Sequence, residues 1–310
     1  MHLIRTVLKV AAAFVFLACA SAPAPDRIPQ DIHQGVRRLR QGASEYQKGC
    51  YLKALQYVQE SHERFSLVDD LQGSAASLNT LANIYYRLGD FRSALSVYDE
   101  AIALFEQLDQ RSGLVRALAN KSAVLIAAGS LDEASRTLDR ADEISKDAYV
   151  LKSLRLKTRA LLLIARGDSR GAETSLVAAL QIASQSEQEF LADIHYTLAQ
   201  LKLIVQRPQE AVSHLQSALE IDRAAGAYFS IGLDLAALGS CYEHLADFVQ
   251  AVNYYKRSLK IFALLEAHPK VQWVRSRLVL CADRAGLNLE PILHWAEQWS
   301  DGHNQAGLCD

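Results

Sequence analysis

One small group of side chains in this sequence has the types expected of a metal-dependent catalytic site. His294 and Glu297 lie one helical turn apart, and His303 follows them. Metalloenzymes usually set such ligands in a fixed motif, for example the HExxH that places two histidines on one helix face. The sequence contains no HExxH, no GxSxG nucleophile turn and no glycine-rich phosphate loop. We therefore predict that the protein is not an enzyme and uses no cofactor, and a metal enzyme built on these three residues is the least supported alternative.

The cysteines offer a second kind of chemistry, which depends on the compartment. Cys281 and Cys309 are a candidate disulfide that would pin the C-terminal tail onto the last helix in an oxidising compartment. Spacing alone does not decide which cysteines pair. Cys241 stands between Gly239 and Tyr242, where a small buried residue fits, and we interpret it as a packing residue.

The first residues have the pattern of an export signal. Arg5 and Lys9 precede an apolar run, residues 10–18, which is too short to span a hydrocarbon layer of about 30 Å. The segment 16–19, Phe-Leu-Ala-Cys, resembles a bacterial lipobox, although that motif prefers Leu at the first of these positions and a small residue at the second. The resemblance implies a diacylated Cys19, a tether at residues 20–31, and anchoring to the outer membrane rather than the inner one, facing the periplasm. Ordinary cleavage after Ala20 or Ala22 is the alternative.

The elements that must position any binding residues are indicated by an alanine that returns every 38 to 40 residues. Three further tracks of small or turn-forming residues keep step with it, before and after each alanine. Small residues at these spacings let two antiparallel helices approach closely, and glycine five positions before an alanine ends the first helix of each pair. The pattern predicts about six helical hairpins stacked into one array. The six alanines are Ala54, Ala94, Ala134, Ala172, Ala211 and Ala251.

The second unit shows which family the pattern resembles. Residues 81–91, Leu-Ala-Asn-Ile-Tyr-Tyr-Arg-Leu-Gly-Asp-Phe, and 94–101, Ala-Leu-Ser-Val-Tyr-Asp-Glu-Ala, match the small, Tyr, Gly, Ala, aromatic and Ala positions of the tetratricopeptide repeat in order. The period is nearer 40 residues than the familiar 34 or so. The resemblance covers about residues 35–265 and implies an all-α fold, a right-handed α-solenoid of about six hairpins.

The resemblance also implies where a partner binds. In this family the first helices of the hairpins line a concave groove that holds a peptide or a helix. The positions that would face such a groove here are Asn79, Asn83, Tyr86, Arg87, Arg116, Asn120, Lys157, Tyr196 and Gln200, followed by Ser240, Glu243 and His244. Arg87, Arg116 and Lys157 would favour an acidic segment or a terminal carboxylate. The alternative is that these residues only solvate the inner wall.

Beyond the last hairpin, the repeat pattern fades and all three tryptophans occur, at 273, 295 and 299. An open array needs a cap on its last unit, and two helices near 269–285 and 290–300 would supply one. We therefore divide the chain into a signal peptide with lipobox (1–19), a tether (20–31), the repeat array (32–268), capping helices (269–302) and a tail (303–310).

Composition narrows the class of partner. A formal net charge of −2 argues against a nucleic-acid-binding protein, which usually carries a basic excess on one face. We predict an interaction scaffold or adaptor at the bacterial cell envelope that binds another envelope protein or a peptide segment, with the lipid anchor as its membrane contact and with no small-molecule substrate. The alternative from a different class is a cytoplasmic regulatory array that controls a signalling partner, with the leader misinterpreted.

Overall fold

The computed structural model describes residues 30–145, 151–187 and 190–291, together with residues 293, 294, 298, 308 and 309. This part of the chain contains thirteen α-helices and no β-strand. The helices are α1 (Gln30–Lys48), α2 (Tyr51–Ser66), α3 (Leu71–Leu88), α4 (Phe91–Gln107), α5 (Arg111–Ala127), α6 (Leu131–Ile144), α7 (Lys152–Ala165), α8 (Ser169–Ser186), α9 (Leu191–Ile204), α10 (Pro208–Ala225), α11 (Tyr228–His244), α12 (Phe248–Leu264) and α13 (His268–Ala285).

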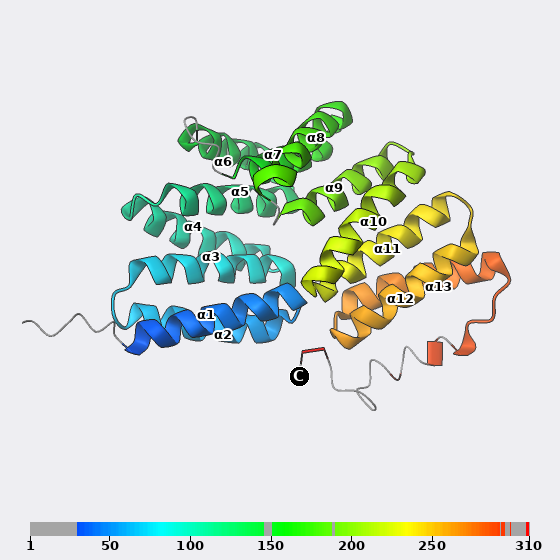
Figure 1. Cartoon of the computed structure of the whole chain (residues 1–310), viewed down its shortest axis with the longest axis horizontal. Helices are drawn as coiled ribbons and strands as arrows, with labels where there is room; N and C mark the ends of the chain where they lie inside the picture. Colours follow the sequence, from blue (N-terminus) through cyan, green and yellow to red (C-terminus); the bar gives the residue numbers. More distant parts are fainter. Residues whose placement is uncertain are drawn as a thin grey trace, which may run out of the picture.

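Consecutive helices pair into six hairpins, from α1 with α2 to α11 with α12, and α13 packs on the last of them. The first helices of the six hairpins, from α1 to α11, also contact one another in series, and the hairpins follow one another along the arc seen in Figure 1. The predicted all-α solenoid of about six hairpins is therefore confirmed. None of the described helices combines the length and apolar character of a membrane span.

The predicted repeat alanines form the contact lines between helices. All six have no exposed surface. A second track of small residues lies about two turns later on the same helices, and its alanines, Ala101, Ala141, Ala179 and Ala218, are equally buried. Where the track carries serine, the hydroxyl group donates to a backbone carbonyl of the paired helix: Ser61 Oγ lies 2.8 Å from the Gly35 oxygen, and Ser258 Oγ lies 2.7 Å from the Gly232 oxygen. Small residues therefore set the helix separation, as the pattern predicts.

Each hairpin turn uses one residue with a left-handed backbone. The four glycines at the predicted turn positions have φ between +81° and +96°, and in the two later hairpins Gln206 and Ala246 both adopt φ of +58°. The turn satisfies carbonyl groups at the end of the first helix: the Asp90 N–H donates to the Tyr85 oxygen at 2.9 Å, and equivalent bonds follow the other turns. A side chain is strained in this conformation, so the last two turns are less favourable than the first four.

The C-terminal cap is described only in part. Helix α13 agrees with the predicted first capping helix, and its Trp273 packs edge-on against Tyr255 with ring centroids 6.2 Å apart. Trp273 remains 46% exposed, so the last hairpin covers it only in part. Most of the predicted second capping helix, with Trp295 and Trp299, lies outside the described residues. The signal peptide and Cys19 also lie outside them, and residues 30 and 31, which we assigned to the tether, already form the first turn of α1.

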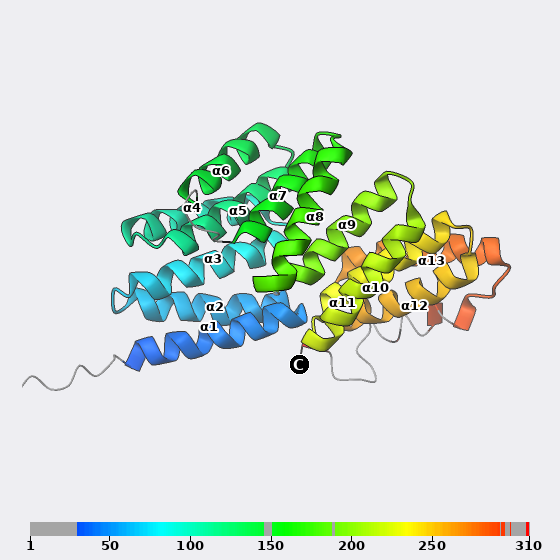
Figure 2. The same ribbon diagram turned by 45° about the horizontal axis from the view of Figure 1, so that its top comes forward.

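The predicted Cys281–Cys309 disulfide is wrong. Cys309 is bonded to Cys50, 259 positions earlier, with a Cα–Cα distance of 5.4 Å. Cys281 of α13 has a free thiol, which is buried in the hydrophobic core that α13 forms with α11 and α12. The physical reason is curvature: the arc brings the beginning of α2 back to the C-terminal segment, as Figure 2 shows where the blue first hairpin meets α11. Burial raises the pKa of Cys241 to about 12 and that of Cys281 to about 11, which keeps both thiols protonated and agrees with a packing role for Cys241.

The turn geometry generates the first prediction. Gln206→Gly and Ala246→Gly should each raise the free energy of unfolding by up to about 1 kcal/mol, because glycine adopts positive φ without a Cβ clash. Gly89→Ala is the matched opposite change, since the added Cβ would meet nothing within 4 Å and only the backbone conformation suffers. It should lower the free energy by about 1–2 kcal/mol. Urea unfolding followed by circular dichroism measures all three, and a loss of stability in both glycine variants would contradict the explanation.

Candidate functional site

Seven of the twelve predicted groove residues line one pocket of about 300 Å³ on the inner face of the array. We call it the central pocket. Helices α1, α3, α4, α5, α7 and α9 contribute to its wall together with the residue that precedes α9. Its lining residues are Tyr46, Asn83, Tyr86, Arg87, Tyr98, Arg116, Asn120, Ala123, Leu154, Lys157, Leu161, Phe190, Asp193, Tyr196 and Thr197. Asn79 and Gln200 do not line it.

A hydrogen-bonded set of neutral side chains forms one side of the pocket. The Tyr98 hydroxyl donates to Asn83 Oδ1 at 2.6 Å, and Asn120 Nδ2 donates to the same oxygen at 3.3 Å. Tyr98 comes from the second helix of its hairpin and is fully buried, so it fixes Asn83 from behind. Because the protein already occupies the Asn83 carbonyl oxygen, the amide nitrogen is the group that Asn83 can offer to a ligand.

Three cations from three hairpins face this pocket. Arg87 Nε donates to the Tyr46 hydroxyl at 3.2 Å, the Arg116 guanidinium lies 5.6 Å from the centre of the Phe190 ring, and Lys157 Nζ lies 2.7 Å from Asp193 Oδ2. The interaction with Tyr46 is the largest cause that raises the pKa of Arg87, so that side chain stays charged at every relevant pH. Lys157 lowers the pKa of Asp193 to about 2. The lining therefore carries two more positive charges than negative ones.

Sequence reasoning missed Asp193 and Tyr46, although both carry a usable signal. Asp193 stands at the same register before its repeat alanine, Ala211, as Arg116 does before Ala134, and Tyr46 stands at the register of Tyr86. The register alone would have placed them on the inner wall. That Asp193 pairs with Lys157 follows from the way α7 and α9 are stacked, which the sequence pattern does not specify.

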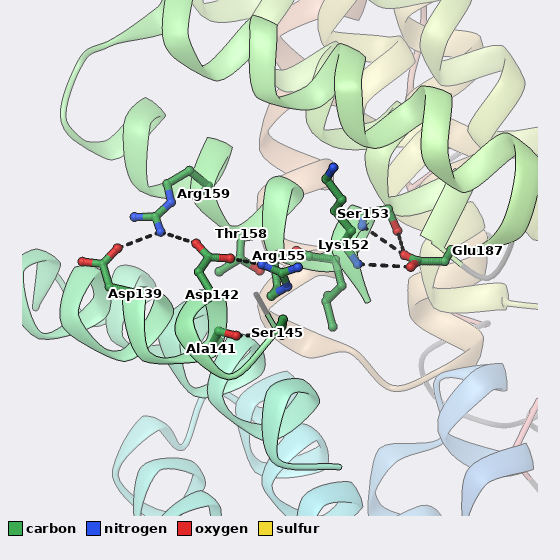
Figure 3. A network of polar contacts seen from close by, with 11 residues as sticks. Asp139, Ala141, Asp142, Ser145, Lys152, Ser153, Arg155, Thr158, Arg159 and Glu187 are labelled. Atoms are coloured by element: carbon green, nitrogen blue, oxygen red, sulfur yellow. Dashed lines mark hydrogen bonds and ion pairs between the residues drawn. The ribbon is translucent and has the colours of Figure 1, made fainter. Parts of the chain in front are cut away.

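Helix α7, which carries Lys157, is held in place by ion pairs and a cap shown in Figure 3. Asp142 of α6 pairs with both Arg155 and Arg159 of α7, and Arg159 also contacts Asp139 at 2.8 Å. At the start of α7, the Glu187 carboxylate accepts from the backbone N–H of residues 152 and 153 at 3.1 and 3.0 Å. A carboxylate at a helix N-terminus satisfies free N–H groups and favours the helix dipole. The ion pairs join the third hairpin to the fourth, and the Glu187 cap joins the two ends of the fourth hairpin, so together they set where Lys157 stands.

Two other groups of predicted residues have different surroundings. Glu243 pairs with Arg277 of α13 and accepts from the Tyr255 hydroxyl at 3.1 Å, while the carbonyl oxygen of Ser240 lies 2.8 Å from His244 Nδ1. Glu243 thus joins the last hairpin to α13, and none of the three residues lines the central pocket. For the metal hypothesis, Glu297 and His303 lie outside the described residues, and within those residues no group of three or more His, Cys, Asp or Glu side chains is arranged for a metal ion.

Comparison with known families gives the same architecture. A model of the tetratricopeptide repeat matches residues 38–107, 74–147 and 190–263, which together make up more than half of the chain. The chain belongs to the tetratricopeptide repeat family. Proteins of this family are typically non-enzymatic scaffolds for protein interactions.

Solved structures resemble this tetratricopeptide repeat protein in fold at low sequence identity. A signal-transduction ATPase with a tetratricopeptide repeat sensor from Pyrococcus horikoshii has a TM-score of 0.61 at 16% identity over 85% of this chain, which spans only 40% of that protein. A Rap protein in complex with competence and sporulation factor has a TM-score of 0.59 at 14% identity, covering 88% of this chain and 78% of that one. No curated protein sequence matches the chain.

Beside the central pocket, two carboxyl groups of this tetratricopeptide repeat protein share one site. Asp222 of α10 and Asp234 of α11 are hydrogen-bonded to each other, and Asp234 is 1% exposed with its Oδ2 atom buried and without a partner among the described residues. Burial is the main cause that raises the pKa of Asp234 to about 9, and burial likewise raises that of Asp222 to about 6. Asp193 on α9 opposes ionisation of the pair, and Arg223 favours it. The pair therefore holds a proton at neutral pH.

The second prediction concerns this proton. The folded pKa of Asp234 lies above the value of about 4 for an unfolded aspartate, so stability falls as the pH rises between about 4 and 9. Asp234→Asn should raise Tm by a few degrees at pH 8 and change it little at pH 4, because an amide can donate to Asp222 without a proton. Differential scanning calorimetry at pH 4 and at pH 8 measures Tm. An equal shift of Tm at both pH values would refute the idea that Asp222 and Asp234 share a proton. Asp222→Asn should have the smaller effect at pH 8, because Asp234 stays buried and burial is the main cause that raises its pKa.

Proposed function

We propose that this protein is an interaction scaffold whose central pocket binds an acidic segment or the terminal carboxylate of a partner protein. The observation that carries the proposal is the convergence of Arg87, Arg116 and Lys157, from three different hairpins, on one pocket with a single lining carboxylate. Guanidinium groups bind carboxylates with two parallel hydrogen bonds, and a partly dehydrated site strengthens each of them.

The shape of the pocket limits what it accepts. Its volume of about 300 Å³ is at the lower end of the range for ligand sites in proteins. It therefore suits one acidic side chain or one chain end of the partner, with the rest of the partner lying along the inner wall. The Asn83 amide group and the hydroxyl group of Tyr196 are placed to hydrogen-bond the partner backbone beside that group.

Lys157 can pair with a partner carboxylate only after its ion pair with Asp193 has been broken. Its side chain is only 13% exposed, and Asp193 neutralises it in the empty pocket. A partner carboxylate competes with Asp193 for Lys157, whereas Arg87 has a neutral phenol as its hydrogen-bond partner. We infer that Arg87 contributes more to the affinity than Lys157 does, because no ion pair has to be broken first.

We also propose that the scaffold is exported and lipid-anchored at Cys19, facing the periplasm from the outer membrane. The leader pattern of residues 1–19 supports this, and the Cys50–Cys309 disulfide provides separate support because such bonds persist in oxidising compartments. The partner would then be another envelope protein. A cytoplasmic regulatory array is the competing assignment, and the disulfide counts against it.

The third prediction tests the pocket. A photoreactive residue at Ala123, a small neutral position in the lining, should crosslink a partner in cells, and mass spectrometry should identify an acidic side chain or a chain end at the crosslink. Arg87→Gln should reduce the yield at least tenfold, because it removes the charge while retaining a hydrogen-bond donor.

Two control variants make this experiment decisive. A photoreactive residue at Val177, which is 55% exposed on α8, samples the outer surface and should not capture the same partner. Arg170→Gln removes a cation outside the pocket and should leave the yield at Ala123 unchanged. Equal capture at both photoreactive positions, or a basic crosslinked segment, would refute the proposed site.

The fourth prediction tests the anchor. If Cys19 is lipidated, inhibition of the lipoprotein signal peptidase should leave the unprocessed precursor, and Cys19→Ala should abolish both this response and the recovery of the protein in the outer-membrane fraction. A protein that stays in the cytoplasmic fraction and keeps residues 1–18 would establish the competing assignment.

A further inference from the structure

The two ends of the repeat array touch, although they are far apart in the sequence. Gln47 Nε2 at the end of α1 donates to the carbonyl oxygen of Ala225 at 3.2 Å, and the Tyr51 ring of α2 packs edge-on against Phe229 of α11 with centroids 5.2 Å apart. Phe229 in turn contacts Phe262 of α12. We call this contact between the first hairpin and α11 the seam, and it lies in Figures 1 and 2 where the end of α1 reaches α11.

Gly49 allows the first hairpin to approach α11 closely at the seam. A Cβ atom at this position would lie 2.5 Å from the Phe229 Cβ and 3.2 Å from the Phe229 backbone nitrogen. The turn glycines of the second, third and fourth hairpins have nothing within 4 Å of the equivalent point. Gly49 therefore has two roles, the left-handed turn that all four glycines share and a backbone approach that only the seam requires.

The C-terminal segment is bonded covalently to the first hairpin and by a hydrogen bond to the sixth. Cys50, directly after Gly49, is bonded to Cys309, and Lys53 Nζ donates to the Cys309 carbonyl oxygen at 2.8 Å. The neighbouring Leu308 N–H donates to the carbonyl oxygen of Leu264, the last residue of α12, at 3.4 Å. Residues 308 and 309 thus bind the first hairpin on one side and the sixth on the other.

The seam shares residues with the central pocket. Tyr46, which lines the pocket and accepts a hydrogen bond from Arg87, also packs against Tyr51, with ring centroids 5.5 Å apart. Tyr51 is the residue that meets Phe229. Tyr46 and Tyr51 therefore form a continuous line of contacts from the Arg87 side of the pocket to Phe229 at the seam.

We propose that the seam is a redox-controlled gate of the central pocket, closed while Cys50 and Cys309 are bonded and released when that disulfide is reduced. The gate itself is independent of the ligand, and its consequence for partner binding rests on the proposed function. The reductant is a dithiol, either small or carried by a thiol–disulfide oxidoreductase.

The chemical step is thiol–disulfide exchange. One thiolate of the dithiol attacks Cys309 Sγ, because Cys50 is only 3% exposed and Cys309 is more accessible. The Sγ–Sγ bond breaks, and Cys50 leaves as a thiolate and takes a proton. The second thiolate of the dithiol then attacks the mixed disulfide, and Cys309 leaves and is protonated. Two electrons pass to the protein, and the dithiol becomes a disulfide.

Hydrogen exchange of the full chain, followed by mass spectrometry, tests the gate without a ligand. Dithiothreitol should speed exchange at least tenfold in segments 45–51 and 225–232 and leave α6 unchanged. A Cys50→Ser/Cys309→Ser variant should show the fast exchange without reductant and no further response to it. Equal rates in the oxidised and reduced wild type would overturn the gate, and they would leave the crosslinking test of the pocket unaffected.

Gly49→Ala and Gly89→Ala separate the seam from a general loss of stability. Both place a side chain at positive φ, +96° and +83° respectively, and only the first meets Phe229. Gly49→Ala should therefore speed exchange in segment 225–232 even with the disulfide formed, whereas Gly89→Ala should affect only its own hairpin. If the two variants speed exchange in segment 225–232 equally, the close approach of Gly49 to Phe229 does not hold the seam together.

Discussion

The close approach of paired helices at the repeat alanines is the constraint on which the rest of the structure depends. Each of the six alanines is fully buried, so each sets the separation and angle of its hairpin within narrow limits. In a stacked array each hairpin is placed by the one before it, and small rotations add along the chain. The meeting of Gly49 with Phe229 is the sum of these rotations, and a larger residue at one alanine position would change where the two ends lie.

This dependence explains what the sequence predicted and what it did not. The helical hairpins follow from local signals, namely small residues and turn glycines in register, and the inner position of Arg87 and Lys157 follows from the same register. The pairing of Cys309 with Cys50 depends instead on the accumulated curvature. A repeat pattern specifies the neighbours of each unit but not the total rotation, so contacts between the first and last hairpins cannot be read from it.

Curvature also creates the electrostatics of the central pocket. Arg87, Arg116 and Lys157 are separated along the chain, and each would be an ordinary groove residue on a straight array. The arc brings them to one small volume with a single lining carboxylate, where charges interact more strongly than they do in water. Asp193 relieves part of the resulting repulsion, and the positive charge of Lys157 is the main cause that lowers the pKa of its carboxyl group.

Closure and ligand binding should therefore be coupled in both directions. Tyr46 and Tyr51 connect the Arg87 side of the pocket to Phe229 at the seam, so the position of the first hairpin affects both. A partner that binds the closed pocket more tightly than the open one must favour closure by the same factor, because linkage is reciprocal. The disulfide acts on that equilibrium without touching the ligand. It restricts the open state, which lowers the entropy of that state and favours the closed one.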